Sequence, residues 1–331
     1  MVNVLANDGI SKSGIDALTN MGFNISTTTV AQEQLINHIN SQNIAVLLVR
    51  SATTVRKDLI DQCPSLKIIG RGGVGMDNID VEYARSRGLN VINTPAASSS
   101  SVAELVFAHL YSGVRFLHES NRNMPLEGDS NFKVLKKAYA KGVELRGKTI
   151  GIIGFGRIGR ETAKIALGVG MNVLACDKAI KKTDIKLDFG NGKTIDFNIK
   201  ISSFLDVLKK SDFISLHVPA QKEYIINKKE FNLMKDGVGI INAARGGVIN
   251  ELELLAALDS GKVSFAGLDT FENEPKPAIK LLMHPNISLT PHIGAATNEA
   301  QDRIGLELAE QIINILKKNV WKFKKKMGNW E

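Results

Sequence analysis

The chain has 331 residues, of which 44% are hydrophobic and 23% are charged, and its net charge is +8. This composition is typical of globular proteins and excludes an intrinsically disordered chain, and the length suffices for two domains. Apolar runs such as Ile44–Val49 are far shorter than the roughly 20 residues of a membrane helix. The start of the chain, Val2–Ala6, resembles a strand rather than a signal peptide. Two cysteines, Cys63 and Cys176, supply neither a disulfide framework nor a cysteine-rich metal site. We therefore expect a cytoplasmic protein with no bound metal and no membrane partner.

Much of the positive charge lies at the C-terminal end. Residues 317–331 contain six lysines and one acidic residue, so this segment carries +5 and the rest of the chain only +3. A basic excess confined to a tail is more typical of a solvated end than of a nucleic-acid surface. Trp321 and Trp330 lie in the same tail and have no evident structural use. We predict a solvated basic tail from about residue 317 and no nucleic-acid partner.

In the first part of the chain, apolar strand patterns alternate with amphipathic helix patterns. The predicted strands are Val2–Ala6, Ile44–Val49, Leu66–Gly70 and Leu89–Ile92. The predicted helices are Gly14–Met21, Leu35–Ile39, Val55–Gln62 and Val81–Arg87. A longer helix is predicted from Ser99 to about His118, and one of its faces carries Val102, Leu105, Val106, His109 and Leu110. Such alternation predicts a parallel sheet with helices on both faces.

After a polar linker, predicted over Asn121–Val143, the alternation begins again. The predicted strands here are Lys148–Ile153, Val173–Ala175, Phe213–Val218, Val238–Ile241, Phe265–Leu268 and Ile287–Leu289, and a last helix covers Glu299–Leu316. The sequence therefore predicts an α/β protein with two units in series.

A glycine-rich turn follows the strand that ends at Ile153. Gly154, Gly156 and Gly159 form the pattern GxGxxG, which opens a helical segment, and Asp177 ends the next strand, 18 residues after Gly159. The three glycines suit a tight turn, a close approach of backbone N–H groups to a pyrophosphate, and helix–strand packing. A carboxylate at Asp177 suits a ribose 2′-hydroxyl and disfavours a 2′-phosphate. This context predicts NAD as the cofactor, although Lys178, Lys181 and Lys182 leave NADP open.

Three further polar residues follow successive predicted strands. Arg245 follows Val238–Ile241, and Glu274 and His292 follow the next two strands. The oxidation of a secondary alcohol needs a base, a group that orients the base, and a cation for the substrate; histidine, carboxylate and arginine suit these tasks. Taken singly, each residue also fits an ordinary surface or turn position, and spacing alone does not choose among the six histidines.

Several longer stretches resemble the D-isomer-specific 2-hydroxyacid dehydrogenase family over nearly the whole chain, to about Leu316. The matching stretches are Leu48–Val55, Gly70–Asp80, Gly151–Gly159, Leu216–Pro219, Asn242–Val248, Gly267–Pro275 and Thr290–Ala295. The resemblance implies two doubly wound parallel-sheet domains, with a Rossmann NAD-binding domain (98–293) inserted into a flavodoxin-like substrate domain (1–97 and 294–331). The long helix after residue 98 would then be a linker and a homodimer contact.

The resemblance also implies the site residues. His292 would be the general base, Glu274 its partner and Arg245 the ligand of the substrate carboxylate, and Asp269 would contact the nicotinamide carboxamide. The cofactor-binding residues would be Gly154, Gly156, Arg157, Ile158, Gly159, Asp177, His217, Val218, Pro219, Ala243, Ala244, Asp269, Gly294 and Ala295. The substrate-binding residues would be Arg50, Ser51, Arg71, Gly72, Gly73 and Val74.

Arg50 and Arg71 end two successive predicted strands, beside a glycine-rich turn at Gly72–Gly75. Forked guanidinium donors and backbone N–H groups suit a phosphate, although both arginines also fit ordinary surface positions. Both match the phosphoglycerate dehydrogenase branch of the family, which implies NAD-dependent oxidation of D-3-phosphoglycerate in serine biosynthesis. The alternatives are a glyoxylate or hydroxypyruvate reductase, another D-2-hydroxyacid dehydrogenase, and a binding protein like the family's NAD-sensing corepressors.

Two departures from the family pattern are visible. Ser98 stands where family members usually carry an asparagine, three residues after Pro95. The sequence also contains no counterpart of the regulatory C-terminal domains of many phosphoglycerate dehydrogenases, so we expect a short form without serine feedback.

Overall fold

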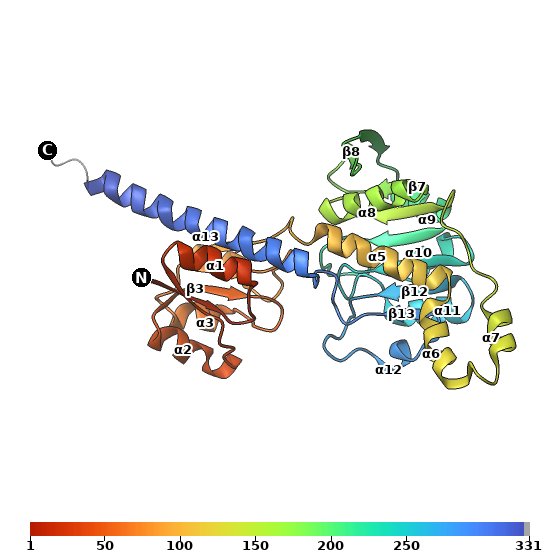
Figure 1. The fold of residues 1–331 in the computed structure, drawn as a ribbon, viewed down its shortest axis with the longest axis horizontal. Helices are drawn as coiled ribbons and strands as arrows, with labels where there is room; N and C mark the ends of the chain where they lie inside the picture. Colours follow the sequence, from red (N-terminus) through yellow and green to blue (C-terminus); the bar gives the residue numbers. More distant parts are fainter. Residues whose placement is uncertain (328–331) are drawn as a thin grey trace. The chain divides into compact units, whose positions relative to one another are not determined.

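The computed structural model describes residues 1–327, which fold into two compact units. The first unit comprises Met1–Ser98 and Ala295–Glu331, and the second comprises Ser99–Gly294. Figure 1 shows the first unit in red and orange together with the blue C-terminal helix. Each unit has its own sheet and its own core.

The first unit is built on a five-stranded parallel sheet. Its strands are β1 (Val2–Ala6), β2 (Phe23–Ser26), β3 (Ile44–Val49), β4 (Ile68–Arg71) and β5 (Asn90–Asn93), in the order β2-β1-β3-β4-β5. All four neighbouring pairs are parallel. This is the strand order of flavodoxin-like folds. The predicted strands are present, and β2 is a strand that the sequence analysis missed.

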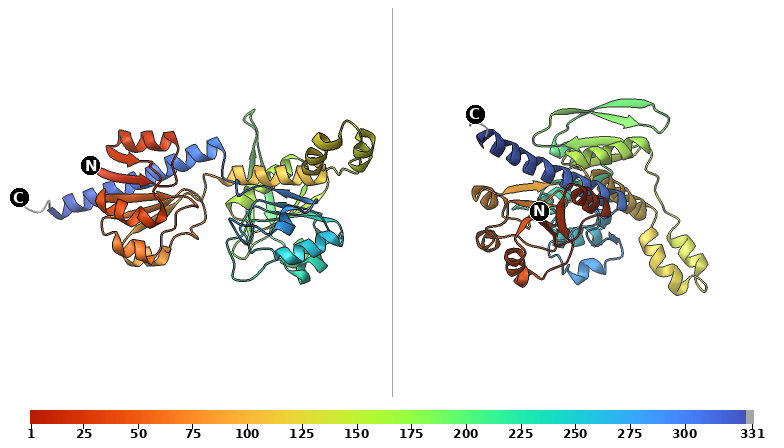
Figure 2. Two further views of the ribbon diagram at one scale, coloured as in Figure 1. Left: turned by 90° about the horizontal axis from the view of Figure 1, so that it is seen from below. Right: turned by 60° about the vertical axis from the view of Figure 1, so that its left-hand side comes forward.

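Helices cover both faces of this sheet (Figures 1 and 2). They are α1 (Lys12–Asn20), α2 (Leu35–Ser41), α3 (Lys57–Gln62), α4 (Val81–Ser86) and α13 (Asn298–Met327), with a short 3-10 turn at Gln32–Gln34. Leu18 of α1 shares a core cluster with Ile304 and Ile312 of α13, whereas α2, α3 and α4 pack on the opposite face. Two glycines allow α1 and α13 to touch, because a Cβ on Gly14 would lie 2.8 Å from the Cα of Gly305.

Helix α13 extends past the end predicted at Leu316. The side chains of the predicted basic tail, including Trp321 and Trp330, lie outside the described residues. The tail's role therefore stays a prediction.

The second unit contains a six-stranded parallel sheet. Its strands are β6 (Thr149–Ile153), β7 (Asn172–Cys176), β10 (Phe213–Leu216), β11 (Val238–Asn242), β12 (Val263–Leu268) and β13 (Ile287–Leu289), in the order β13-β12-β11-β10-β6-β7. A single parallel bridge between Ala175 and Ile201 occupies the place beyond β7 where a Rossmann fold has its third strand. The strand order along the sheet reverses at β6, because β7 lies on one side of it and β10 on the other. The turns that follow β6, β7 and β10 therefore lie side by side at the carboxyl-terminal edge of the sheet.

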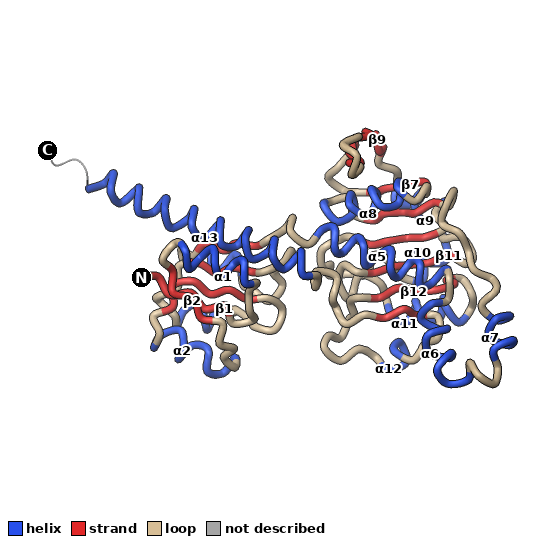
Figure 3. Tube along the Cα trace, in the orientation of Figure 1, coloured by secondary structure: helices blue, strands red, loops and turns tan. Residues whose placement is uncertain are grey.

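Helices also cover both faces of this second sheet (Figure 3). Helices α5 (Ser99–Val114) and α8 (Arg157–Gly168) pack on one face, and α9 (Phe204–Lys210), α10 (Lys228–Leu233) and α11 (Glu251–Asp259) pack on the other. A short helix, α12 (Ile279–Leu282), precedes β13. Both sheets are thus doubly wound and parallel, which confirms the predicted fold class. Within the described part of the chain, no helix is both long enough and apolar enough to span a bilayer.

An antiparallel hairpin follows β7, formed by β8 (Lys182–Asp188) and β9 (Thr194–Lys200). Ile185 and Ile199 on its inner face are buried in the core cluster that includes α8. The sequence analysis missed this hairpin, although its signals are present. Apolar residues alternate with polar ones in both strands, and the connecting turn contains Asn191–Gly192.

The predicted long helix is broken near its end. Helix α5 stops at Val114, because Phe116 adopts a left-handed backbone with φ 54°, and α6 (Leu117–Glu127) begins at the next residue. A further helix, α7 (Phe132–Ala138), follows, so the segment predicted as a linker is largely helical. This segment exposes apolar side chains, which include Leu126 (80% exposed), Phe132 (56%) and Val134 (65%).

Candidate active site

The glycine-rich turn connects β6 to α8, and each glycine meets a different constraint. Gly154 has φ +92°, and a Cβ there would overlap the carbonyl oxygen of His217. A Cβ on Gly159 would overlap the carbonyl oxygen of Gly154, so only glycine allows α8 to start this close to β6.

Gly156 caps α8 without any side-chain hydrogen bond, and its Cα faces open space. The first N–H groups of the helix therefore face a cradle without side chains, which fits the pyrophosphate of a dinucleotide. Arg157 and Ile158 form the first turn of α8; Arg157 is exposed and Ile158 is half-buried.

Asp177 is fixed directly beside this turn. Its Oδ2 accepts a hydrogen bond from the N–H of Phe155 (2.7 Å), and its Oδ1 accepts from Ala179 (2.8 Å) and Ile180 (3.1 Å). Burial opposes ionisation, but these three N–H groups outweigh it and hold the pKa of Asp177 below its ordinary value. The turn is thus bordered by a carboxylate that is anionic at neutral pH.

His217 follows β10 with its imidazole directed into the unit. Its Nε2 lies 2.9 Å from Ser215 Oγ and 3.3 Å from Thr162 Oγ1, and burial lowers the pKa of His217 to about 3. The side chain is therefore neutral and joins β10 to α8, which leaves its backbone to face the glycine turn. Its Nδ1 is buried without a partner among the described residues. Val218 is half-buried and Pro219 is exposed beyond it.

The turn after β11 carries Arg245. Asn242 fixes this turn, because its Nδ2 donates to the Arg245 carbonyl (2.8 Å) and its Oδ1 accepts from the N–H of Ala244 (3.1 Å). Ala243 and Ala244 are both buried, whereas Arg245 is half-buried, with Nη1 2.6 Å from the Ala244 carbonyl. A Cβ on Gly246 would overlap the carbonyl of Phe271, so this turn packs against the segment that leads to Glu274.

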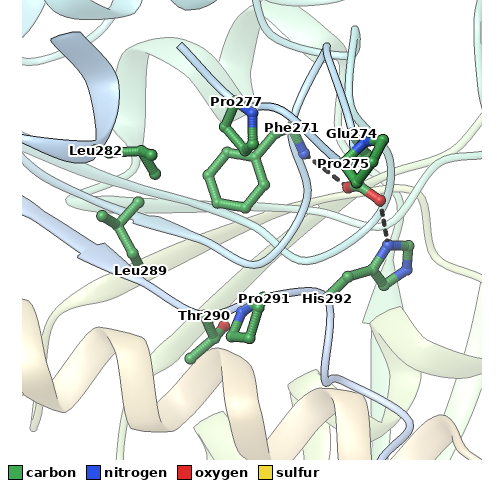
Figure 4. Close-up of a pocket in the computed structure, with 9 residues that line it drawn as sticks. All are labelled: Phe271, Glu274, Pro275, Pro277, Leu282, Leu289, Thr290, Pro291 and His292. Atoms are coloured by element: carbon green, nitrogen blue, oxygen red, sulfur yellow. Dashed lines mark hydrogen bonds and ion pairs between the residues drawn. The ribbon is translucent and has the colours of Figure 1, made fainter. Parts of the chain in front are cut away.

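Glu274 and His292 form the hydrogen-bonded pair that the resemblance implies. His292 Nδ1 lies 2.8 Å from Glu274 Oε2, and Glu274 Oε1 accepts from the N–H of Phe271 at 2.9 Å. The two side chains are 41% and 36% exposed, so both stay open to a ligand. Figure 4 shows the pair at the edge of an apolar cavity of about 410 Å³, lined by residues that include Phe271 and Leu289.

Asp269 directly follows β12 and is only 1% exposed. Its Oδ1 accepts hydrogen bonds from the Thr290 hydroxyl (2.6 Å) and the N–H of Ile293 (2.8 Å), and its Oδ2 accepts from the N–H of Gly294 (2.9 Å). The carboxylate thus binds the turn that carries His292 on both sides of that residue. Ala295 directly follows this turn and is half-buried.

In the first unit, Arg50 and Arg71 lie at the ends of β3 and β4, and each lies beside the Gly72–Gly73 turn. A Cβ on Gly72 would lie 3.6 Å from Arg50 Cγ, and a Cβ on Gly73 would overlap the guanidinium of Arg71. The backbone beneath Arg50 is anchored by Asp8 Oδ2, which accepts from the N–H of Arg50 at 2.6 Å.

Around these arginines, Ser51 and Val74 are exposed, whereas Gly72 and Gly73 are buried. Ser98, the departure from the family pattern, is buried where the first unit ends. Among residues 1–327, no three histidine, cysteine or acidic side chains are arranged to bind a metal.

The polar groups that hold the His292 turn are not evident from the sequence. Thr290 belongs to the matching stretch Thr290–Ala295, and Ser288 lies within a predicted strand. His109 lies on the apolar face of its predicted helix. A titratable residue on such a face is the sequence feature that points to a role for it.

Comparison with known proteins identifies the family. Residues 107–294 match the NAD binding domain of the D-isomer specific 2-hydroxyacid dehydrogenases. The chain is 42% identical to the hydroxypyruvate reductase of Thermotoga maritima, over 95% of this chain and 98% of that protein. It is 39% identical to the D-3-phosphoglycerate dehydrogenase of Archaeoglobus fulgidus, over 96% of this chain, but spans only 58% of that protein's length.

Among solved structures, a glyoxylate reductase from Paecilomyes thermophila superposes with a TM-score of 0.80 at 28% identity, covering 96% of each chain. Family, fold and NAD as the cofactor are therefore confirmed, while the roles of individual residues stay predictions. The chain belongs to the D-isomer specific 2-hydroxyacid dehydrogenase family of NAD-binding enzymes.

Proposed function

We propose that this enzyme oxidises D-3-phosphoglycerate to 3-phosphohydroxypyruvate with NAD, as a cytoplasmic step of serine biosynthesis. The observation that carries the choice of substrate is the position of two arginines, Arg50 and Arg71, beside the Gly72–Gly73 turn. A phosphate at this turn would accept hydrogen bonds from both forked guanidinium groups. The identity to phosphoglycerate dehydrogenases supports the same choice.

His292 is the proposed general base. Because its Nδ1 is occupied by Glu274, its Nε2 is the ring nitrogen left to accept the proton of the C2 hydroxyl. Glu274 is itself held by the N–H of Phe271, so it fixes the orientation of the imidazole and stabilises the charge that develops on it. Bound NAD would supply the acceptor for the hydride that leaves C2.

Arg245 is the proposed ligand of the substrate carboxylate. It lies in a turn held by Asn242, and this turn packs against the segment that carries Glu274. A two-pronged interaction with the carboxylate would orient C2 and its hydroxyl. The proposed cofactor contacts are those at the glycine turn and Asp177, where the cradle at Gly156 supports them.

A homodimer is the proposed assembly, with α5 to α7 as the contact. Tyr111 is 41% exposed, and Leu126, Phe132 and Val134 are more exposed still, so this part of the second unit presents more apolar surface than an isolated subunit favours. A second copy of the chain would cover it.

The second candidate is reduction of hydroxypyruvate or glyoxylate. It is favoured by the 42% identity to a hydroxypyruvate reductase that the chain matches over nearly its full length. Hydroxypyruvate and glyoxylate carry no phosphate. The two candidate functions therefore differ in whether phosphorylated or unphosphorylated compounds are the better substrates.

The deciding experiment compares each substrate with its dephosphorylated analogue. NADH formation is measured with D-3-phosphoglycerate and with D-glycerate, and NADH consumption with 3-phosphohydroxypyruvate, hydroxypyruvate and glyoxylate. We expect kcat/KM to be at least about a hundredfold higher for the phosphorylated members, because two charged hydrogen bonds contribute about 3 kcal/mol together. Equal or better reduction of hydroxypyruvate would establish the reductase instead. NAD binding without turnover of any compound would favour a binding protein.

A further inference from the structure

A buried histidine outside the proposed catalytic pair lies beneath the turn that carries His292. His109 belongs to α5 and is only 2% exposed. It fits there because β12 has a glycine opposite it: a Cβ on Gly267 would lie 2.6 Å from the Cβ of His109. An imidazole thus occupies a position in the core where an apolar side chain would be ordinary.

Both ring nitrogens of His109 have partners on and after β13. Nδ1 lies 2.9 Å from Ser288 Oγ, and Nε2 lies 2.9 Å from Thr290 Oγ1. The Thr290 hydroxyl in turn donates to Asp269 Oδ1 at 2.6 Å, and Asp269 also accepts from the N–H groups of Ile293 and Gly294. A continuous hydrogen-bonded path therefore runs from α5 to both sides of His292.

The carboxylate at the end of this path fixes the direction of the hydrogen bonds between it and His109. Asp269 only accepts when ionised, so the single hydroxyl proton of Thr290 must point toward it. Thr290 Oγ1 must then accept the proton of His109 Nε2–H, which leaves Nδ1 as an acceptor facing the hydroxyl of Ser288; that hydroxyl also lies 3.4 Å from Ser112 Oγ. The path requires the neutral imidazole with its proton on Nε2.

The surroundings of His109 favour that neutral form. Burial lowers the pKa of His109 to about 4, although the nearby Asp269 carboxylate partly opposes this shift and His118 adds to it. His118, at the start of α6, lies near the same helix face, with its Nδ1 3.3 Å from Ser112 Oγ. His109 is therefore neutral throughout the range in which dehydrogenase activity is measured.

The turn at the end of the path needs this support. His292 has φ 55°, a left-handed backbone conformation that residues with a side chain adopt at a cost. Its N–H contacts the Thr290 carbonyl at 3.1 Å, and the next two residues donate to Asp269. Because Thr290 lies two residues before His292 and Ile293 directly follows it, a rotation of the Thr290 side chain would release one side of the turn.

We propose that His109 is a positioning residue that acts through Thr290 and Asp269 to hold the His292 imidazole against Glu274. The proposal rests on the proposed role of His292 as the general base. It adds a residue from α5, more than 180 positions away in the sequence, to the apparatus that orients the base.

The test compares replacements of His109 that keep or lose one defined hydrogen bond. In H109Q, the amide nitrogen lies at the position of Nε2 and can donate to Thr290. In H109N, the amide group lies at the position of Nδ1 and reaches Ser288 alone. H109L loses both interactions. The matched control is L110A, which creates a defect at the neighbouring buried position of α5 without touching the path.

We expect H109L and H109N to lower kcat about tenfold or more, while KM for the substrate and the dissociation constant for NAD change less than about threefold. H109Q should restore most of kcat, and L110A should lower the melting temperature but leave kcat unchanged. T290V should lower kcat like H109L, and the double variant H109L/T290V should lose no more than either single variant.

Wild-type kcat in H109L or H109N, or additive losses in the double variant, would overturn the proposal. If H109L does not fold, the comparison of H109Q with H109N decides, and equal kcat in these two overturns it. The proposed function is tested separately by replacing His292 itself, so a failure of one inference is distinguishable from a failure of the other.

Discussion

Asp177 combines a structural role with a proposed role in cofactor binding. Its carboxylate accepts three backbone N–H groups, one of them from Phe155 within the glycine-rich turn, and the same group is the proposed partner of the adenosine ribose. An anion fixed this firmly would repel a 2′-phosphate. The proposed contact thus makes Asp177 the side chain that discriminates NAD from NADP.

Replacing Asp177 by alanine should raise KM for NAD more than it lowers kcat, because a ribose contact is made equally in the ground state and the transition state. The preference for NAD over NADP should fall at the same time. Steady-state kinetics with both cofactors checks this, with Asp206→Ala on α9 as a surface control. An unchanged ratio of kcat/KM for the two cofactors would show that Asp177 does not face the ribose.

Among single residues, the sequence predicted those whose proposed role depends on the type of side chain. The pairing of Glu274 with His292 followed from the family resemblance, and the structure brings the two within 2.8 Å. The left-handed backbone of His292 was not predictable, since the turn around it is held by Asp269, which follows a different strand. The same holds for Thr290, whose role depends on which helix packs beneath it.

At the scale of elements, the packing of α5 on β12 and β13 combines a structural and a functional requirement. An imidazole in this interface must stay neutral, because burial lowers the pKa of His109 to about 4 from its ordinary 6.5. In the unfolded chain the same group takes up a proton near pH 6.5. The unfolded state therefore binds more protons between these two values, and the free energy of unfolding must fall as the pH drops through this window.

At pH 5, protonation of His109 in the unfolded state should lower the free energy of unfolding by on the order of 2 kcal/mol. Above about pH 7 it should have no effect. Urea unfolding followed by circular dichroism at pH 7.5, 6 and 5 measures it in the wild type and in H109Q, whose side chain does not titrate. The variant should lose less stability over this range than the wild type. Parallel losses in the two proteins would mean that His109 does not resist protonation in the folded state.

Helices and strands were predictable where apolar residues recur at the spacing of a helix or a strand. The buried strands of both sheets and helix α8 have such a period, and the predicted order of strands and helices led to the correct fold class. Helices α6 and α7 lack such an apolar period. Their apolar residues Leu126, Phe132 and Val134 are exposed and do not form one buried face. The break at Phe116 was also hidden, since nothing in the local sequence requires a left-handed residue there.

At the scale of the whole molecule, the proposed roles fall on side chains of both units. Arg50 and Arg71 belong to the first unit, whereas Arg245, Glu274 and His292 belong to the second. The strand order β2-β1-β3-β4-β5 places β3 beside β4, and the ends of these two strands carry the two arginines. The topology of one small sheet therefore creates the proposed phosphate site.

Arg50→Ala and Arg71→Ala should each weaken binding of D-3-phosphoglycerate by about 1.5–3 kcal/mol, the range for hydrogen bonds to charged groups. Turnover of D-glycerate, which has no phosphate, should change far less. The matched control is Arg56→Ala in the same unit, whose exposed guanidinium pairs with Asp80 at 2.9 Å and donates to the Asp77 carbonyl at 3.0 Å. Equal losses with both substrates would assign the two arginines a structural role and would remove the main support for a phosphorylated substrate.

In the proposed mechanism, His292, oriented by Glu274, removes the hydroxyl proton during NAD-dependent oxidation. This step is tested by measuring kcat for NADH formation in His292→Asn, with NAD binding followed in parallel by fluorescence titration. We expect kcat to fall roughly 10²–10⁴-fold, the usual contribution of a general base, with NAD affinity unchanged. A His292→Asn enzyme that binds NAD and retains a kcat near that of the wild type would show that another group removes the proton.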